Sequence, residues 1–160
     1  YPKKGRLKME LDKLDRAILN MLQSDATVSL KTLAEAVHSS PATCQRRIAA
    51  LTENGVIVRQ TAQVSPPKVG FSISVFVHIE LERQHHSVQE AFERAMQREA
   101  RVAGCWEISG DYDFLLLVHA EDMAAYHALT RRLFTADNHV RTFKSQFVMN
   151  AAKAETKISL

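Results

Sequence analysis

The sequence has little cysteine and no long apolar run. Its two cysteines, Cys44 and Cys105, are too few for a disulfide framework, and each sits in an apolar pattern typical of a small buried side chain. No apolar stretch approaches the roughly 20 residues that span a membrane. The basic start of the chain has no apolar core of a signal peptide behind it. These absences predict a globular protein of the cytoplasm.

Motifs for catalysis, metals and phosphate-binding loops are also missing. The seven histidines show neither H-E-x-x-H nor Cys/His zinc spacing, and the five glycines form no phosphate-binding loop. Asp111 and Asp113 are close in sequence, but the pattern between two predicted strands is that of an exposed turn without a nucleophilic set. We therefore expect no enzyme, no cofactor and no metal site.

Charge is distributed unevenly along the 160 residues. Residues 1–61 hold ten Lys/Arg and six Asp/Glu, a net charge of +4, whereas residues 62–160 hold eleven and twelve, a net charge of −1. The length suits two small domains. A basic first part joined to a near-neutral remainder favours a nucleic-acid-binding module linked to a second domain.

Three short amphipathic helices are predicted in the first part. Apolar residues at helical spacing mark the first helix from Leu11 to Leu22 and the second from Leu30 to Val37. The third begins at Ser40, a good N-cap, followed by Pro41 at the first helical position, and it ends at Asn54-Gly55. Helix, short helix, tight turn and helix in this order predict a helix-turn-helix.

The third helix has the properties of a DNA-recognition helix. Cys44, Ile48 and Leu51 fall on one apolar stripe, and Arg46 projects from the opposite face. An outward arginine can donate two hydrogen bonds to guanine, and Arg47, nearer the core edge, suits a phosphate. The predicted DNA-contacting residues are Ser40, Thr43, Gln45, Arg46 and Arg47.

The second part alternates strands and helices. Residues 72–81 alternate between apolar and polar positions, with Phe76 an apolar exception on the wetter face. A helix behind a Ser87–Glu90 capping box, strands over 102–108 and 114–118, a helix capped by Asp122 and a strand over 140–149 follow. The order βαββαβ predicts a ferredoxin-like sheet with two helices on one face, so that the class is α+β. Dimerisation would hide the other face.

Two sequence runs make a family resemblance specific. Residues 11–19 read L-D-x-x-D-x-x-I-L, and residues 40–57 read S-P-x-x-C-x-R-R-I-x-x-L-x-x-x-G-V-I. The chain resembles the Lrp/AsnC family of bacterial and archaeal transcription regulators, except that His38 and Ser39 stand where the family commonly has glycine and leucine. A glycine there eases a left-handed backbone.

The resemblance implies a domain plan and partners. It implies a helix-turn-helix domain at 9–61, a hinge strand and linker at 62–71 that begins in the β-prone run 56–64, and an effector-binding RAM domain (regulation of amino-acid metabolism) at 72–160. It also implies double-stranded DNA as partner, association with the nucleoid, and dimers that join into homo-octamers with effector sites between dimers.

The resemblance further implies a small amino acid as effector. Its loop would be G-D-Y-D, where backbone N–H groups can hold the α-carboxylate and Asp113 or Asp111 the α-ammonium. Apolar side chains at Met123 and Val148 favour leucine or methionine. The implied effector residues are Ser109, Gly110, Asp111, Tyr112, Asp113, Met123, Gln146 and Val148.

A second class remains open from the residues alone. The chain could be a ferredoxin-like small-molecule sensor or enzyme with an incidental helical head. That alternative needs a ligand on the open sheet face, and His78 is the residue there that suits it.

Overall fold

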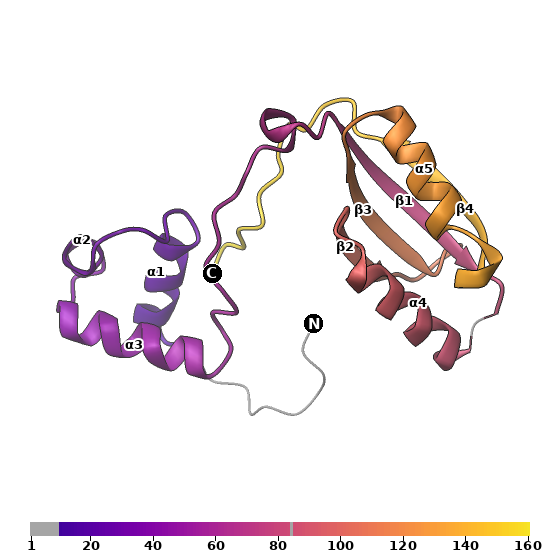
Figure 1. Ribbon diagram of the computed structural model, residues 1–160. Coiled ribbons are helices and arrows are strands. Elements are labelled where there is room, and N and C mark those ends of the chain that lie inside the picture. The colour runs from indigo at the N-terminus through magenta and orange to yellow at the C-terminus, as the bar shows by residue number, and fades with distance from the viewer. Residues whose placement is uncertain (1–9, 84) are drawn as a thin grey trace. The chain divides into compact units, whose positions relative to one another are not determined.

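The computed structural model describes residues 10–83 and 85–160. They form two compact units. The first contains the chain up to Ala62 together with Lys153–Leu160, and the second contains Gln63–Ala152. Figure 1 shows the three helices of the first unit and the sheet with two helices in the second.

The first unit is built on three capped helices, α1 (Lys13–Leu22), α2 (Leu30–Ala36) and α3 (Pro41–Glu53). Asp12, Ser29 and Ser40 each accept a backbone N–H from the first turn of the helix that they precede. Asp12 and Asp15 also form a reciprocal capping box. The local sequence signals therefore set all three helix starts: the predicted cap Ser40 is confirmed, and the first helix begins at Lys13 rather than at Leu11.

One small core holds these helices together. Its fully buried side chains come from each helix, with Ile18 in α1, Leu33 in α2, and Cys44 and Leu51 in α3. Helices of 7 to 13 residues are marginal alone in water, so packing supplies their stability. The apolar stripe predicted for α3 is the stripe that packs against α1 and α2.

The turn between α2 and α3 has a left-handed residue at the position where sequence comparison with the family pattern expects glycine. His38 has a φ of 52°. The Ser39 N–H reaches back to the Ala34 carbonyl, which satisfies the end of α2. A non-glycine residue in this region carries steric strain, and His38 is exposed, so its side chain contributes little packing in return.

The hinge strand expected over 56–64 is absent within the described chain. Residues 58–65 have no regular structure, and a short 3₁₀ helix, η1 (Pro66–Val69), follows. Val58 and Val64 are 82% and 62% exposed. A strand exists only where a second strand pairs with it, and the expected partner was a second copy of the chain.

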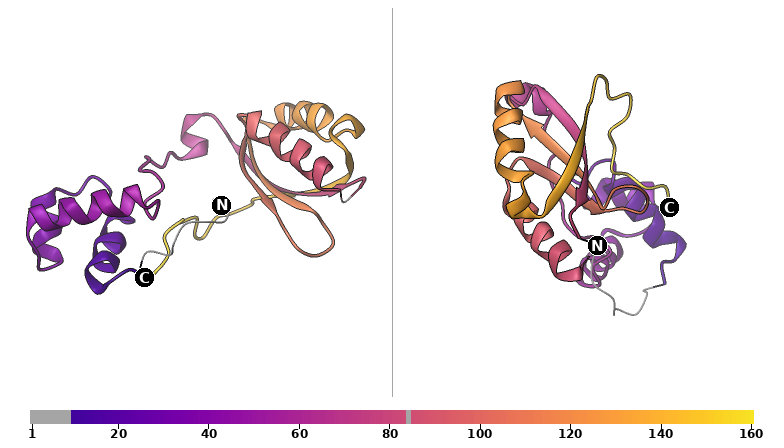
Figure 2. Two further views of the ribbon diagram at one scale, coloured as in Figure 1. Left: turned by 90° about the horizontal axis from the view of Figure 1, so that it is seen from below. Right: turned by 90° about the vertical axis from the view of Figure 1, so that its right-hand side faces the viewer.

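The second unit is a four-stranded antiparallel sheet with the strand order β2-β3-β1-β4. In chain order its elements are β1 (Ile73–Leu81), α4 (His86–Arg98), β2 (Val102–Glu107), β3 (Phe114–Ala120), α5 (Met123–Leu133), the 3₁₀ helix η2 (Ala136–Asn138) and β4 (Val140–Phe147). Figure 2 shows α4 and α5 on the same face of the sheet. The predicted ferredoxin-like βαββαβ fold is confirmed.

The two faces of the sheet differ in cover. Under the helices lies a continuous core whose members include Phe92, Phe114, Tyr126 and Phe134. On the other face Phe76 and Trp106 are 37% and 41% exposed. Within the described part of the second unit both helices lie on the opposite face, as the βαββαβ order predicted.

Several predicted element bounds were also wrong, such as that of β3, which runs to Ala120 rather than to residue 118. Helix α4 begins at His86, with His85 as N-cap and no side-chain cap, so Ser87 lies inside the helix rather than at its end. The His85 carbonyl accepts the N–H groups of Val88 and Gln89, which starts the helical ladder before Ser87 can cap it. Strand β4 ends at Phe147 rather than Met149, because its pairing with β1 ends there.

No helix among the described residues is long and apolar enough to cross a bilayer.

Candidate DNA-binding surface and effector site

The outer face of α3 presents the side chains that the sequence assigned to DNA. Gln45 and Arg46 are exposed, and Thr43 is half-buried. The Ser40 hydroxyl accepts the Thr43 N–H at 3.1 Å and donates to the Thr43 hydroxyl at 2.9 Å. These two residues therefore begin the helix, while Gln45 and Arg46 offer polar groups that point away from the core.

Arg47 has a different environment from Arg46. Its guanidinium lies 2.8 Å from an Asp12 oxygen and 3.2 Å from an Asp15 oxygen, and the Asp15 side chain is 1% exposed. The Asp15 backbone N–H and then Arg47 lower the pKa of Asp12, and the hydrogen bond that Arg47 donates to Asp12 raises the pKa of Arg47. Arg47 thus joins α3 to the N-terminus of α1, which leaves Arg46 as the better placed arginine for DNA.

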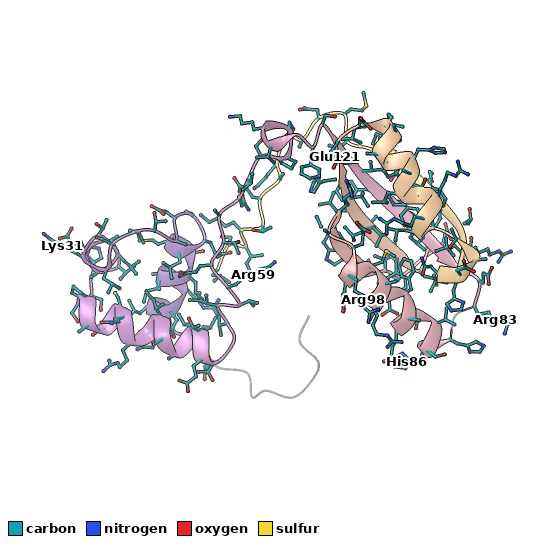
Figure 3. The ribbon with its side chains drawn as sticks, viewed as in Figure 1. Lys31, Arg59, Arg83, His86, Arg98 and Glu121 are labelled. Atoms are coloured by element: carbon teal, nitrogen blue, oxygen red, sulfur yellow. The ribbon has the colours of Figure 1, made fainter. Side chains whose placement is uncertain are left out.

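A basic residue on α2 was missed by the sequence analysis. Lys31 is exposed in the first turn of α2, and Figure 3 shows it projecting outward from that helix. In helix-turn-helix proteins the helix before the recognition helix crosses the phosphate backbone. The helical-spacing argument that identified the outer face of α3 also identifies Lys31 when it is applied to α2.

The β2–β3 loop combines an exposed tip with a buried end. Gly110 has a φ of 117°, which L side chains rarely adopt, and open space surrounds the position of its missing Cβ. Ser109 and Asp111 are exposed. The ring of Tyr112 lies 5.0 Å from the ring of His78 on the open face of the sheet. The tip therefore offers backbone and the Asp111 carboxylate to solvent.

Asp113 lies at the base of this loop and is 8% exposed. Its carboxylate accepts the Leu81 N–H at 2.7 Å, beside the irregular register between Glu80 and Leu81. Its own N–H donates to the Ile79 carbonyl, and its carbonyl accepts the Ile108 N–H. Asp113 therefore anchors the hairpin to the end of β1.

The remaining three effector residues lie at the other end of the sheet. The Val148 N–H donates to the Ser74 carbonyl, whereas the loop bonds to Ile79, five residues further along β1. At roughly 3.3 Å per residue, the Ser74 and Ile79 positions on β1 are about 16 Å apart. Gln146 pairs with Phe76, and Met123 begins α5 with 54% exposure. One chain thus holds two separate groups of the implied residues.

The described residues show no cluster of three or more His, Cys, Asp or Glu that could hold a metal ion. Both cysteines are free. Burial, and then the charge of Glu93, raise the pKa of Cys105 to about 11. A separate shallow cavity of about 250 Å³ is lined by Val64, Phe71, His119 and neighbouring residues, and none of the eight implied effector residues lines it.

Fold and surface together define a class: a helix-turn-helix DNA-binding unit joined to a ferredoxin-like domain. Comparison with known families gives the same division. Residues 11–52 match the AsnC-type helix-turn-helix domain, and residues 74–158 match the Lrp/AsnC ligand binding domain. The chain belongs to the Lrp/AsnC family of DNA-binding transcriptional regulators.

The chain is similar to transcriptional regulators over most of its own length and theirs. An uncharacterized HTH-type transcriptional regulator of Haemophilus influenzae is 58% identical over 96% of this chain and 92% of its own length. The leucine-responsive regulatory protein of Escherichia coli is 34% identical over 97% and 94%. A transcriptional regulator of Neisseria meningitidis, solved in complex with L-Met, has a TM-score of 0.86 at 28% identity over 94% and 96%. These relatives favour a regulator over an enzyme.

Proposed function

We propose that this regulator reads DNA through α3 and responds to an apolar amino acid. The observation that carries the first half is the exposure of Arg46 on the face of α3 opposite the buried Cys44 and Leu51. A helix with this geometry enters the major groove, where a guanidinium can donate two hydrogen bonds to one guanine. A protein that binds chromosomal DNA in this way works at the nucleoid, in the cytoplasm.

The roles of the α3 residues differ. Arg46 and Gln45 face bases, Thr43 and Ser40 lie at the helix start where phosphate contacts occur, and Lys31 adds a contact to the backbone. Arg47 positions α3 through Asp12 and Asp15. It reaches a phosphate only with the part of its side chain, 32% exposed, that this ion pair leaves open.

Selection of bound duplexes from a random library tests this assignment. The parent should enrich one motif. Arg46→Ala should lose the guanine preference at one position per half-site, a cost of about 1–3 kcal/mol. Lys31→Ala is the matched control, since loss of a phosphate contact should weaken all sequences alike and reduce the slope of affinity against salt by about one. If Arg46→Ala enriches the parent's motif with the parent's affinity, α3 is not the reading helix.

The effector proposed for the second unit is leucine or methionine. The tip around Gly110 supplies N–H groups for the α-carboxylate, and Asp111 supplies a carboxylate for the α-ammonium, because Asp113 is already committed to Leu81. Met123 and Val148 supply the apolar contact. The L-Met bound to the relative from Neisseria meningitidis and the name of the leucine-responsive relative agree with this chemistry.

The assembly of subunits that we propose follows from the distance between the 109–113 loop and the other three implied effector residues. About 16 Å divide the loop from the Val148 end of the sheet in one chain, so a complete site draws the loop from one subunit and Met123, Gln146 and Val148 from another. The open face with Phe76 and Trp106 provides a dimer contact. We propose dimers that join further, up to a homo-octamer, with the effector between subunits.

Thermal unfolding with each of the twenty amino acids, read beside the mass of the assembly, tests the effector. A ligand at 100 times its Kd stabilises the protein by about 2.7 kcal/mol. Leucine or methionine should raise the midpoint and change the mass, and lysine and aspartate should do neither. Absence of any shift with all twenty would refute an amino-acid effector.

A further inference from the structure

The last residues of the chain lie against α1 of the first unit. The Asn20 side-chain amide donates to the Leu160 carbonyl at 3.0 Å and accepts the Leu160 N–H at 3.2 Å. The Gln23 side-chain amide does the same for Ile158, at 2.9 Å and 2.8 Å. The N–H and C=O groups of Ile158 and Leu160 are therefore all bonded to side chains at the C-terminal end of α1, and the C-terminal segment belongs to the first unit.

The spacing of the Asn20 and Gln23 side chains fits the spacing of backbone groups in an extended peptide. Residues 158 and 160 are two apart, so their N–H and C=O groups point to the same side and recur about every 6.6 Å. Asn20 and Gln23 are three apart on a helix, with Cβ atoms roughly 5–6 Å from each other, and the longer Gln23 side chain covers the difference. Each amide group acts like one residue of a neighbouring β-strand.

A tail side chain makes one of the hydrogen bonds that hold this segment. The Lys157 ammonium donates to the Ser24 hydroxyl at 2.6 Å. Ile158 and Leu160 are 65% and 37% exposed, so apolar burial contributes little to the docking. The Asn20 and Gln23 amides thus recognise backbone rather than a particular side chain.

We propose that Asn20 and Gln23 form a docking site for residues 158–160 of the same chain, and that this segment is a second tether between the DNA-binding unit and β4. The regulatory part of this proposal rests on the proposed amino-acid effector. Nine residues, 149–157, separate Val148, at the candidate effector site, from docked Ile158. The tail is therefore a covalent path from the end of β4 to α1, separate from the 62–71 connection.

Hydrogen exchange on the full chain tests the docking without any ligand. In the parent, the backbone amides of Ile158 and Leu160 should exchange more slowly than those of a coil segment without hydrogen bonds. Asn20→Ala combined with Gln23→Ala should raise their exchange rate about tenfold, since the protecting hydrogen bonds are gone. Arg16→Ala, an exposed change on the same helix, is the matched control and should leave the rate unchanged. Equal rates in the double variant and the parent would overturn the docking site.

A change in the tail tests the same contact from the other side. Ile158→Pro removes the N–H that Gln23 accepts. Ser159→Pro is its matched control, because the residue between two same-side positions points its N–H away from α1. Leu160 should exchange faster in Ile158→Pro than in Ser159→Pro. Equal rates in these two variants would also overturn the contact.

The tether is tested by the effect of the amino acid on DNA affinity. In the double variant the ratio of affinities with and without leucine or methionine should fall towards one, while DNA binding and the ligand-dependent thermal shift persist. An unchanged ratio in a variant whose tail exchanges freely would overturn the tether. A parent that shows no thermal shift with any amino acid instead refutes the proposed effector, and the exchange experiments still decide the docking.

Discussion

Replacing Asp113 and Asp111 separately distinguishes support of the loop from contact with the effector. Asp113→Ala removes the acceptor of the Leu81 N–H and leaves that donor unpaired at a residue that is 3% exposed. A buried unsatisfied group costs about 1–3 kcal/mol. For a unit of about 90 residues each kcal/mol lowers the midpoint by about 4–8 °C, so we expect a fall of roughly 5–20 °C for the second unit.

Asp113→Asn and Asp111→Ala are the variants to compare with Asp113→Ala. Asp113→Asn keeps an oxygen that can accept the Leu81 N–H, so its midpoint should fall less than that of Asp113→Ala. Asp111 is exposed. In the absence of ligand, Asp111→Ala should therefore keep the free energy of unfolding within about 0.5 kcal/mol of the parent's. The amino-acid-dependent rise should disappear in Asp111→Ala and persist, from a lower baseline, in Asp113→Asn.

Differential scanning calorimetry with and without saturating leucine or methionine measures both quantities. An Asp113→Ala protein that unfolds at the parent's ligand-free midpoint, yet no longer responds to the amino acid, would refute the structural role. It would show that Asp113 contacts the ligand.

Three further outcomes follow from single positions. His38→Gly should raise the midpoint of the first unit, because relief of about 1–2 kcal/mol of left-handed strain exceeds the entropy cost of about 0.4–1 kcal/mol, whereas Ser39→Gly should lower it. Gly104→Ala should shift the fluorescence of Trp106, the single tryptophan, to longer wavelength, because a Cβ at residue 104 overlaps its indole ring and displaces it; an unchanged spectrum would contradict this. Cys105, with a pKa of about 11, is a neutral thiol at pH 8, so its alkylation should be slow there and accelerate as the pH rises towards 11; fast labelling of the native protein at pH 8 would contradict its burial.

The sequence predicted the elements whose signals are local. Asp12, Ser29 and Ser40 each precede an apolar period of 3.6 residues, and each caps a helix. The alternation over 72–81 predicted β1 and its two unequal faces. The same local approach failed at Ser87, because the S-x-x-E pattern alone does not say where the backbone ladder begins.

At the candidate site, helical spacing places the Arg46 guanidinium on the side of α3 opposite Cys44 and Leu51, so its outward direction follows from the sequence. The roles of Arg47 and Asp113 follow from the fold, because Arg47 pairs with Asp15 across 32 residues of chain and Asp113 accepts a hydrogen bond from Leu81 across another 32. The fold also decided that Val148 and the 109–113 loop lie at opposite ends of β1, and that Asn20 meets Leu160, 140 residues away. A repeating pattern of side chains records which face of an element is apolar, but which distant groups meet across those faces depends on how the elements pack.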